Sequence, residues 1–140
     1  MNQSLLQEVV IKMLDNDRKS LITIGGKEYS LILTTKATKE IAKRYGGLEN
    51  LGEKLMKAEN FEMALEEIVW LIALLANQSI LINNRLNGEK EELLTEDDVE
   101  ILTSPHELAT HKDAIMEAMF KGTKRNVESE DEDPKNVEVE

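Results

Sequence analysis

The sequence contains no cysteine in 140 residues, and it has only two prolines and two histidines. Without cysteine, neither a disulfide framework nor a thiolate metal site can form, and a reducing compartment suits the chain. Aromatic residues make up only 4% of the sequence, so leucine, isoleucine and methionine must fill most of the core. The N-terminus lacks the basic segment and apolar stretch of a signal peptide. We therefore expect a cytoplasmic protein.

Positive charge is also scarce. The formal net charge is −11, and residues 126–140 contribute −6 of it through seven acidic residues and one lysine. An acidic surface repels phosphate groups, so we expect neither nucleic acid nor an anionic membrane as a partner. The acidic run 128–133 lacks apolar positions and repels itself. This pattern predicts that residues 123–140 form a disordered acidic C-terminal tail.

No arrangement of residues in the sequence indicates a catalytic site. His106 and His111 nearly match the zinc motif H-E-x-x-H, but they are five residues apart instead of four. At that spacing they lie about 140° apart around a helix. Gly25-Gly26-Lys27 lacks the spacing of a phosphate-binding P-loop. We expect no enzymatic activity, no cofactor and no metal site.

The most informative stretch is residues 21–34. Residues 21–24 are apolar or β-branched, and the glycine pair that follows permits the positive φ angles of a two-residue turn. After the turn, Tyr29, Leu31 and Leu33 alternate with other residues, which favours a strand with one buried face. The pattern predicts a β-hairpin with Gly25-Gly26 at its turn.

A capped helix is expected directly after the hairpin. Thr34 or Thr35 is suited to cap its N-terminus. Ala37, Ile41 and Tyr45 recur every four residues and form one apolar face. Gly46-Gly47 then ends the helix, because glycine readily takes the left-handed conformation of a C-cap.

The rest of the chain favours further helices, and the predicted fold class is α+β, mostly helical. An N-terminal β-hairpin is followed by a small helical bundle and the disordered tail. Three segments result: an amphipathic helix at 1–18, the hairpin and helical domain at 19–122, and the tail at 123–140. Within the domain, helices are expected at residues 37–47, 48–58, 64–82, 95–102 and 105–122, the last closed by Gly122.

Residues 68–76 form an uninterrupted apolar run inside the longest predicted helix. The run is too short, and too broken at residues 77–79, to span a bilayer. A helix that is apolar all round must be covered all round, either within its domain or by a neighbouring subunit, so we expect a homo-oligomer. Trp70 is interpreted as a core residue in preference to a partner hot spot. The candidate partner or oligomer contacts are Trp70, Leu71, Leu74, Leu75, Met116, Met119 and Phe120.

Residues 19–86 resemble the start of the tail assembly chaperones of long-tailed phages and prophages. Members of this family often begin with a short strand, a G-G-K-x-Y turn, a second apolar strand and a helix that ends near a double glycine. Here the turn is Gly25-Gly26-Lys27-Glu28-Tyr29, the second strand lies at 31–34 and the helix at 37–47. An apolar helix follows in the family, as residues 64–82 do here.

The resemblance implies a function. Tail assembly chaperones act in the host cytoplasm, where they bind the tape measure protein, keep it soluble and promote assembly of the tail tube around it. They catalyse no reaction and are absent from the mature virion. In many members a ribosomal frameshift adds a C-terminal extension that engages the tail tube protein. This chain would correspond to the shorter product.

Two alternatives stay open. The chain could be a regulatory or antitoxin-like interaction protein whose acidic tail neutralises a basic partner. It could also be a structural head–tail or tail component that is retained in the particle.

Overall fold

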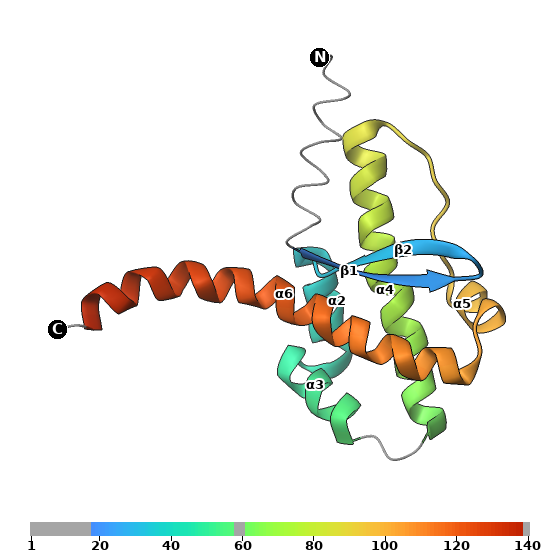
Figure 1. The fold of residues 1–140 in the computed structure, drawn as a ribbon, viewed down its shortest axis with the longest axis horizontal. Helices are drawn as coiled ribbons and strands as arrows, with labels where there is room; N and C mark the ends of the chain where they lie inside the picture. Colours follow the sequence, from blue (N-terminus) through green and yellow to red (C-terminus); the bar gives the residue numbers. More distant parts are fainter. Residues whose placement is uncertain (1–17, 58–60, 139–140) are drawn as a thin grey trace.

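The computed structural model of the chain describes residues 18–57 and 61–138, and the side chains of residues 18–55 and 65–123. The elements follow in the order β1 (Lys19–Ile24), β2 (Lys27–Ile32), α2 (Thr35–Tyr45), α3 (Leu48–Lys57), α4 (Phe61–Asn87), α5 (Glu96–Leu102) and α6 (Pro105–Glu138). The predicted fold class is confirmed, since an antiparallel hairpin precedes a set of helices (Figure 1). The predicted N-terminal amphipathic helix at residues 1–18 lies, except for Arg18, outside the described residues.

The hairpin forms as the glycine pair predicts. β1 and β2 pair antiparallel with Ile24 opposite Lys27, and Gly25 and Gly26 have φ angles of 59° and 83°. Positive φ at both central residues is the geometry of a type I′ turn, which matches the twist of the two strands. The sequence predicts one buried face for the second strand, but the end of β2 is buried on both faces. Leu31 and Ile32 are both buried, because α4 and α6 both pack against β2.

The predicted caps of α2 are also present. The Thr34 hydroxyl accepts a hydrogen bond from the Ala37 amide at 3.0 Å, and Gly46 closes the helix in the left-handed conformation with φ 91°. The Gly46 amide donates to the Ala42 carbonyl at 2.8 Å. Both helix ends thus satisfy backbone groups that helix geometry leaves unpaired.

α4 is the central element of the fold, and it contacts β2, α2, α5 and α6 (Figure 1). It runs further than predicted in both directions and ends before Gly88, whose φ is 68°. Most of the run 68–76 is buried inside the subunit: Ile68, Val69, Leu71, Ile72, Ala73, Leu75 and Ala76. The chain itself therefore covers most of the apolar helix.

The last two helices begin where their capping sequences predict. Thr95 and Asp98 form a reciprocal capping box at the start of α5. At the start of α6, the Glu107 amide donates to the Ser104 hydroxyl at 3.2 Å, and the Ser104 amide donates to the Glu107 carboxylate at 2.8 Å. Each pair satisfies two backbone donors of the helix start.

α6 lies along the hairpin and is tied to β1 at two points. The Ser20 hydroxyl donates to the Ala114 carbonyl at 2.6 Å, and the Lys121 ammonium donates to the Lys19 carbonyl at 2.9 Å. An exposed strand invites pairing with other chains, and a packed helix reduces that exposure. The hairpin is thereby fixed between α4 and α6.

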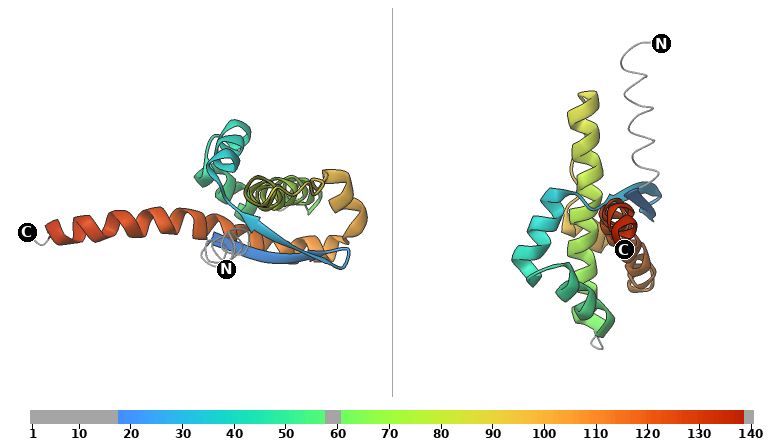
Figure 2. Two further views of the ribbon diagram at one scale, coloured as in Figure 1. Left: turned by 90° about the horizontal axis from the view of Figure 1, so that it is seen from above. Right: turned by 90° about the vertical axis from the view of Figure 1, so that its left-hand side faces the viewer.

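The predicted end of this helix at Gly122 is wrong, because α6 continues to Glu138. Gly122 lies within the helix at the place where α6 passes close to Leu33. Beyond this point α6 extends away from the other elements (Figure 2). The predicted disorder of residues 123–140 concerns the isolated protein in solution and stays a prediction.

Candidate functional site

One face of α4 is left open between α2 and the segment that leads into α5. We call this hollow the α4 groove. Its volume is about 450 Å³, and it is lined by Lys36, Glu40, Trp70, Ala73, Leu74, Asn77, Gln78, Leu81, Leu93, Leu94, Thr95 and Glu96. The α4 residues recur every three or four positions, so they form one stripe along the helix. Along the groove, the described residues leave α4 without a complete cover.

Two amide side chains of α4 fix the walls of the groove. Gln78, which is only 4% exposed, accepts from the Thr34 hydroxyl at 2.6 Å and donates to the Leu74 carbonyl at 3.0 Å. Asn77 donates to the Leu94 carbonyl at 2.8 Å and accepts from the Leu94 amide at 2.7 Å. α2 and the segment before α5 are each hydrogen-bonded to the floor, which preorganises the groove.

Trp70 lies at one end of the groove in a polar and aromatic cluster. The Arg44 guanidinium lies 4.4 Å from the centroid of its ring, and the Tyr45 ring meets it edge-on at 5.9 Å. The Tyr45 hydroxyl donates to Glu67, whose carboxylate lies 3.9 Å from Arg44. Tryptophan, tyrosine and arginine are the residue types most often found at interaction hot spots. Trp70 is half-buried against the core rather than enclosed by it.

The predicted contact residues on α4 separate into two groups. Trp70 and Leu74 line the groove and are partly exposed. Leu71 and Leu75 are completely buried, so in the folded subunit they have no surface for a partner. The reason is helical periodicity: adjacent residues of α4 point about 100° apart, and only one stripe faces the groove.

The predicted contacts on α6 also differ from one another. Met119 is 9% exposed and belongs to the core, and Met116 packs partly against it. Phe120 is 60% exposed, so of the three it has the most surface open to a partner. Ala118, between Met116 and Met119, is buried.

The sequence pattern does not identify four residues of the groove: Asn77, Gln78, Leu81 and Leu93. Asn77 and Gln78 resemble a break in the apolar helix because they are polar. Their spacing could have identified them, because positions 70, 74, 77, 78 and 81 fall on the same helical stripe as Trp70. Leu93 lies in a segment without periodicity, and only the folded chain brings it to the groove.

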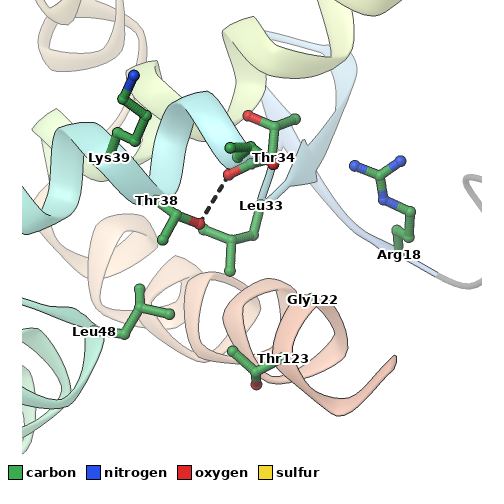
Figure 3. Close-up of a pocket in the computed structure, with 9 residues that line it drawn as sticks. Arg18, Leu33, Thr34, Thr38, Lys39, Leu48, Gly122 and Thr123 are labelled. Atoms are coloured by element: carbon green, nitrogen blue, oxygen red, sulfur yellow. Dashed lines mark hydrogen bonds between the residues drawn. The ribbon is translucent and has the colours of Figure 1, made fainter. Parts of the chain in front are cut away.

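A second hollow, of about 440 Å³, lies between the end of β2, α2, α3 and α6 (Figure 3). Its lining includes Leu33, Thr38, Leu48 and Thr123. Lys39 also lines it, but in Figure 3 the Lys39 side chain points away from the other labelled residues. Arg18 is a second cationic residue of the lining, so the hollow offers hydroxyl, apolar and positively charged surface.

The histidines lie in different surroundings. His106 is exposed at the start of α6, whereas His111 is half-buried against β1, near the Thr23 backbone. Burial lowers the pKa of His111, while Glu107 and the Thr23 backbone act in the opposite direction. Within residues 18–57 and 61–138, no three histidine or acidic side chains come together as a metal site would require.

By length and composition, Leu65–Asn87 could cross a membrane, with a mean hydropathy of 1.6 in its most apolar window. The prediction that this helix is too short and too broken is therefore wrong, since α4 continues through Asn77-Gln78-Ser79. Half of that window is buried within the subunit, as in the core helix of a folded domain. This one helix is weak evidence for a membrane span.

Comparisons of the chain with known protein families, with curated protein sequences and with solved structures give no match.

Proposed function

We propose that the protein is a tail assembly chaperone of a long-tailed phage or prophage. It binds the tape measure protein in the host cytoplasm, keeps it soluble and promotes tail tube assembly, and it does not enter the mature virion. It acts without a cofactor and catalyses no reaction. A frameshifted longer product would bring in the tail tube protein.

One observation carries the proposal: the order and geometry of the N-terminal unit match the layout on which the resemblance rests. A strand leads into the Gly25-Gly26 turn, a second strand follows, and α2 ends at Gly46 in the left-handed conformation. The apolar α4 then forms the centre of the fold. The proposal takes its function from this resemblance, because fold and function are separable.

The surface is compatible with a chaperone. Several large apolar side chains are more than 40% exposed: Leu21, Leu86, Leu93, Ile101, Leu102 and Phe120. A chaperone needs apolar surface to cover a client, and the net charge of −11 keeps such a surface soluble. Apolar contacts are little affected by salt, so client binding should persist at moderate ionic strength.

Co-expression with the tape measure protein tests the proposal. We expect the soluble yield of that client to rise and a complex to co-purify at about 0.3 M salt, where exposed charge pairs are largely screened. Expression of the client alone is the control. An unchanged client yield, with no co-purified complex, would show that the proposal is wrong.

The acidic segment favours one other function, an antitoxin-like interaction protein. Residues 126–140 have a charge of −6, and α6 extends them away from the other elements (Figure 2). A basic partner bound there would dissociate as salt rises. Deletion of residues 126–140 distinguishes the two functions, because it should abolish this kind of binding and leave most of the affinity for the tape measure protein.

A further inference from the structure

We propose that the α4 groove binds a single amphipathic α-helix of a protein partner, with the apolar stripe of that helix on Trp70, Leu74 and Leu81. The inference rests on the proposed function only for the identity of the partner, the tape measure protein. The shape, hydrogen bonding and charge of the groove support the helical occupant independently.

The length of the groove fits a short helix. Its floor extends along α4 from Trp70 to Leu81, which is about 16 Å at 1.5 Å per residue. That distance corresponds to about three turns of a partner helix. Such a helix would present apolar residues at i, i+3, i+4 and i+7, the usual anchors of a helix bound in a groove.

Hydrogen bonding argues against an extended occupant. A bound strand needs free backbone groups along the groove wall. In the segment before α5, Leu94 directs both its amide and its carbonyl to Asn77. The next wall residue, Thr95, donates its amide to the Asp98 carboxylate at 3.1 Å, and its carbonyl accepts from the Val99 amide at 3.2 Å. A strand would leave its own amides unpaired along these residues, whereas a helix satisfies its backbone internally.

The polar groups of the floor are also occupied. Gln78 bonds to α2 and to its own helix, and Asn77 bonds to Leu94. The surface left for contact is therefore mainly apolar, and it is supplied by Trp70, Leu74, Leu81 and the 47% exposed Leu93. An occupant with a continuous apolar stripe suits this floor, since it leaves no buried polar group unpaired.

Charges on the two walls set the orientation of the occupant. α2 presents Lys36 and Glu40 one turn apart, and Arg44 stands at the Trp70 end, while the opposite wall presents Glu96. The complementary helix has an acidic residue and a basic residue one turn apart facing α2, and a basic residue facing Glu96. Exposed pairs of this kind mainly determine orientation and specificity, and the apolar stripe supplies the affinity.

Two lysine substitutions in the groove test its role in client binding. Leu74→Lys and Leu81→Lys should each weaken binding of the tape measure protein by about tenfold or more. Arg85→Ala, at an exposed position of the same helix outside the groove, is the control and should change affinity less than about twofold. Thermal unfolding establishes that each variant is folded. If the client binds the wild type and both groove variants equally, the groove inference is wrong and the proposed function stands.

A second experiment does not depend on the client. Trp70 is the only tryptophan in the chain, so its fluorescence reports occupancy of the groove directly. The probe is a synthetic 18-residue helical peptide with a leucine stripe and the charge arrangement above. A peptide of the same composition, scrambled to remove the stripe, is the control.

We expect the patterned peptide to change the Trp70 emission with saturation, the scrambled peptide to have no such effect, and Leu74→Lys to weaken the response about tenfold or more. An unchanged emission, or an equal response to both peptides, overturns the inference. A wild-type dimer that becomes monomeric on Leu74→Lys without any peptide would also overturn it, because a second copy would then fill the groove. Failure of the tape measure protein to bind, together with a normal peptide response, would refute only the proposed function.

Discussion

Gly122 of α6 and Leu33 at the end of the hairpin approach so closely that a side chain at position 122 would force Leu33 to shift. A Cβ atom on Gly122 would lie 2.8 Å from Cδ2 of Leu33 and 3.0 Å from its Cβ. The absence of a side chain thus lets α6 pack closely on the end of the hairpin, to which it is also hydrogen-bonded through Ser20–Ala114 and Lys121–Lys19.

Gly122→Ala should therefore destabilise the protein by about 1–3 kcal/mol, in spite of the higher helix propensity of alanine. Gly52→Ala in α3 is the control, because a Cβ there meets nothing within 4 Å. It should stabilise the fold by about 0.5–1 kcal/mol. Urea unfolding measures both, and a Gly122→Ala variant at least as stable as wild type would contradict the close packing.

The pKa of His111 is lowered in the fold by burial, so the unfolded chain takes up its proton at a higher pH than the folded chain does. Neutral His111 therefore makes its full contribution to the free energy of unfolding above the unfolded pKa, which is near 6.5. That contribution is lost as the pH falls from there through the folded pKa. We expect His111→Gln to reduce the loss of stability between about pH 7 and pH 5 relative to wild type.

His106→Gln is the control for this pH dependence, since His106 is exposed. Denaturant unfolding across the pH range gives the comparison for both variants. Equal pH dependence in wild type and His111→Gln would show that His111 makes no contribution.

Leu75→Asp should unfold the subunit, because Leu75 has no exposed surface and an aspartate there would bury an unpaired charge. Leu86→Asp should have little effect, because Leu86 is 42% exposed on the same helix. Circular dichroism during heating separates the two outcomes.

The sequence predicts a homo-oligomer because α4 is apolar all round. The chain buries most of α4 within the subunit, so this helix alone is not a reason to expect self-association. The homo-oligomer is therefore a separate proposal that depends on the remaining exposed apolar residues. Light scattering at increasing protein concentration measures it. A constant monomer mass would refute it.

The backbone of residues 124–138 should exchange its amide hydrogens much faster than that of residues 105–121. This part of α6 contains Pro134, which lacks an amide hydrogen, and a run of acidic residues near the negative C-terminal end of the helix dipole. These features oppose a helix that has no tertiary support. Amide exchange by nuclear magnetic resonance gives the rates, and similar protection in both segments would refute a disordered tail.

Local chemistry made the hairpin and the helix starts predictable. Gly25-Gly26 specifies its turn because only glycine takes both positive φ angles without strain. Thr34 and Ser104 specify helix starts because a side-chain oxygen satisfies a nearby backbone amide. None of these features depends on distant parts of the chain.

The groove was predictable only in part. The apolar pattern predicts Trp70 and Leu74 as contact residues, but it equally predicts Leu71 and Leu75, which are buried in the folded subunit. Which stripe of an apolar helix stays open depends on where α2 and the segment before α5 dock. Those positions follow from bonds between residues 17 to 44 apart in the sequence, such as Asn77 with Leu94 and Gln78 with Thr34.

The sequence by itself determined the turn, the caps and the class of fold, because each arises from interactions within a few residues. The tertiary structure alone decided that Gly122 is a packing position rather than a helix end, that Phe120 lies outside the core and that α4 keeps one open stripe. These outcomes depend on which surfaces meet when distant elements pack, and no local pattern encodes that choice.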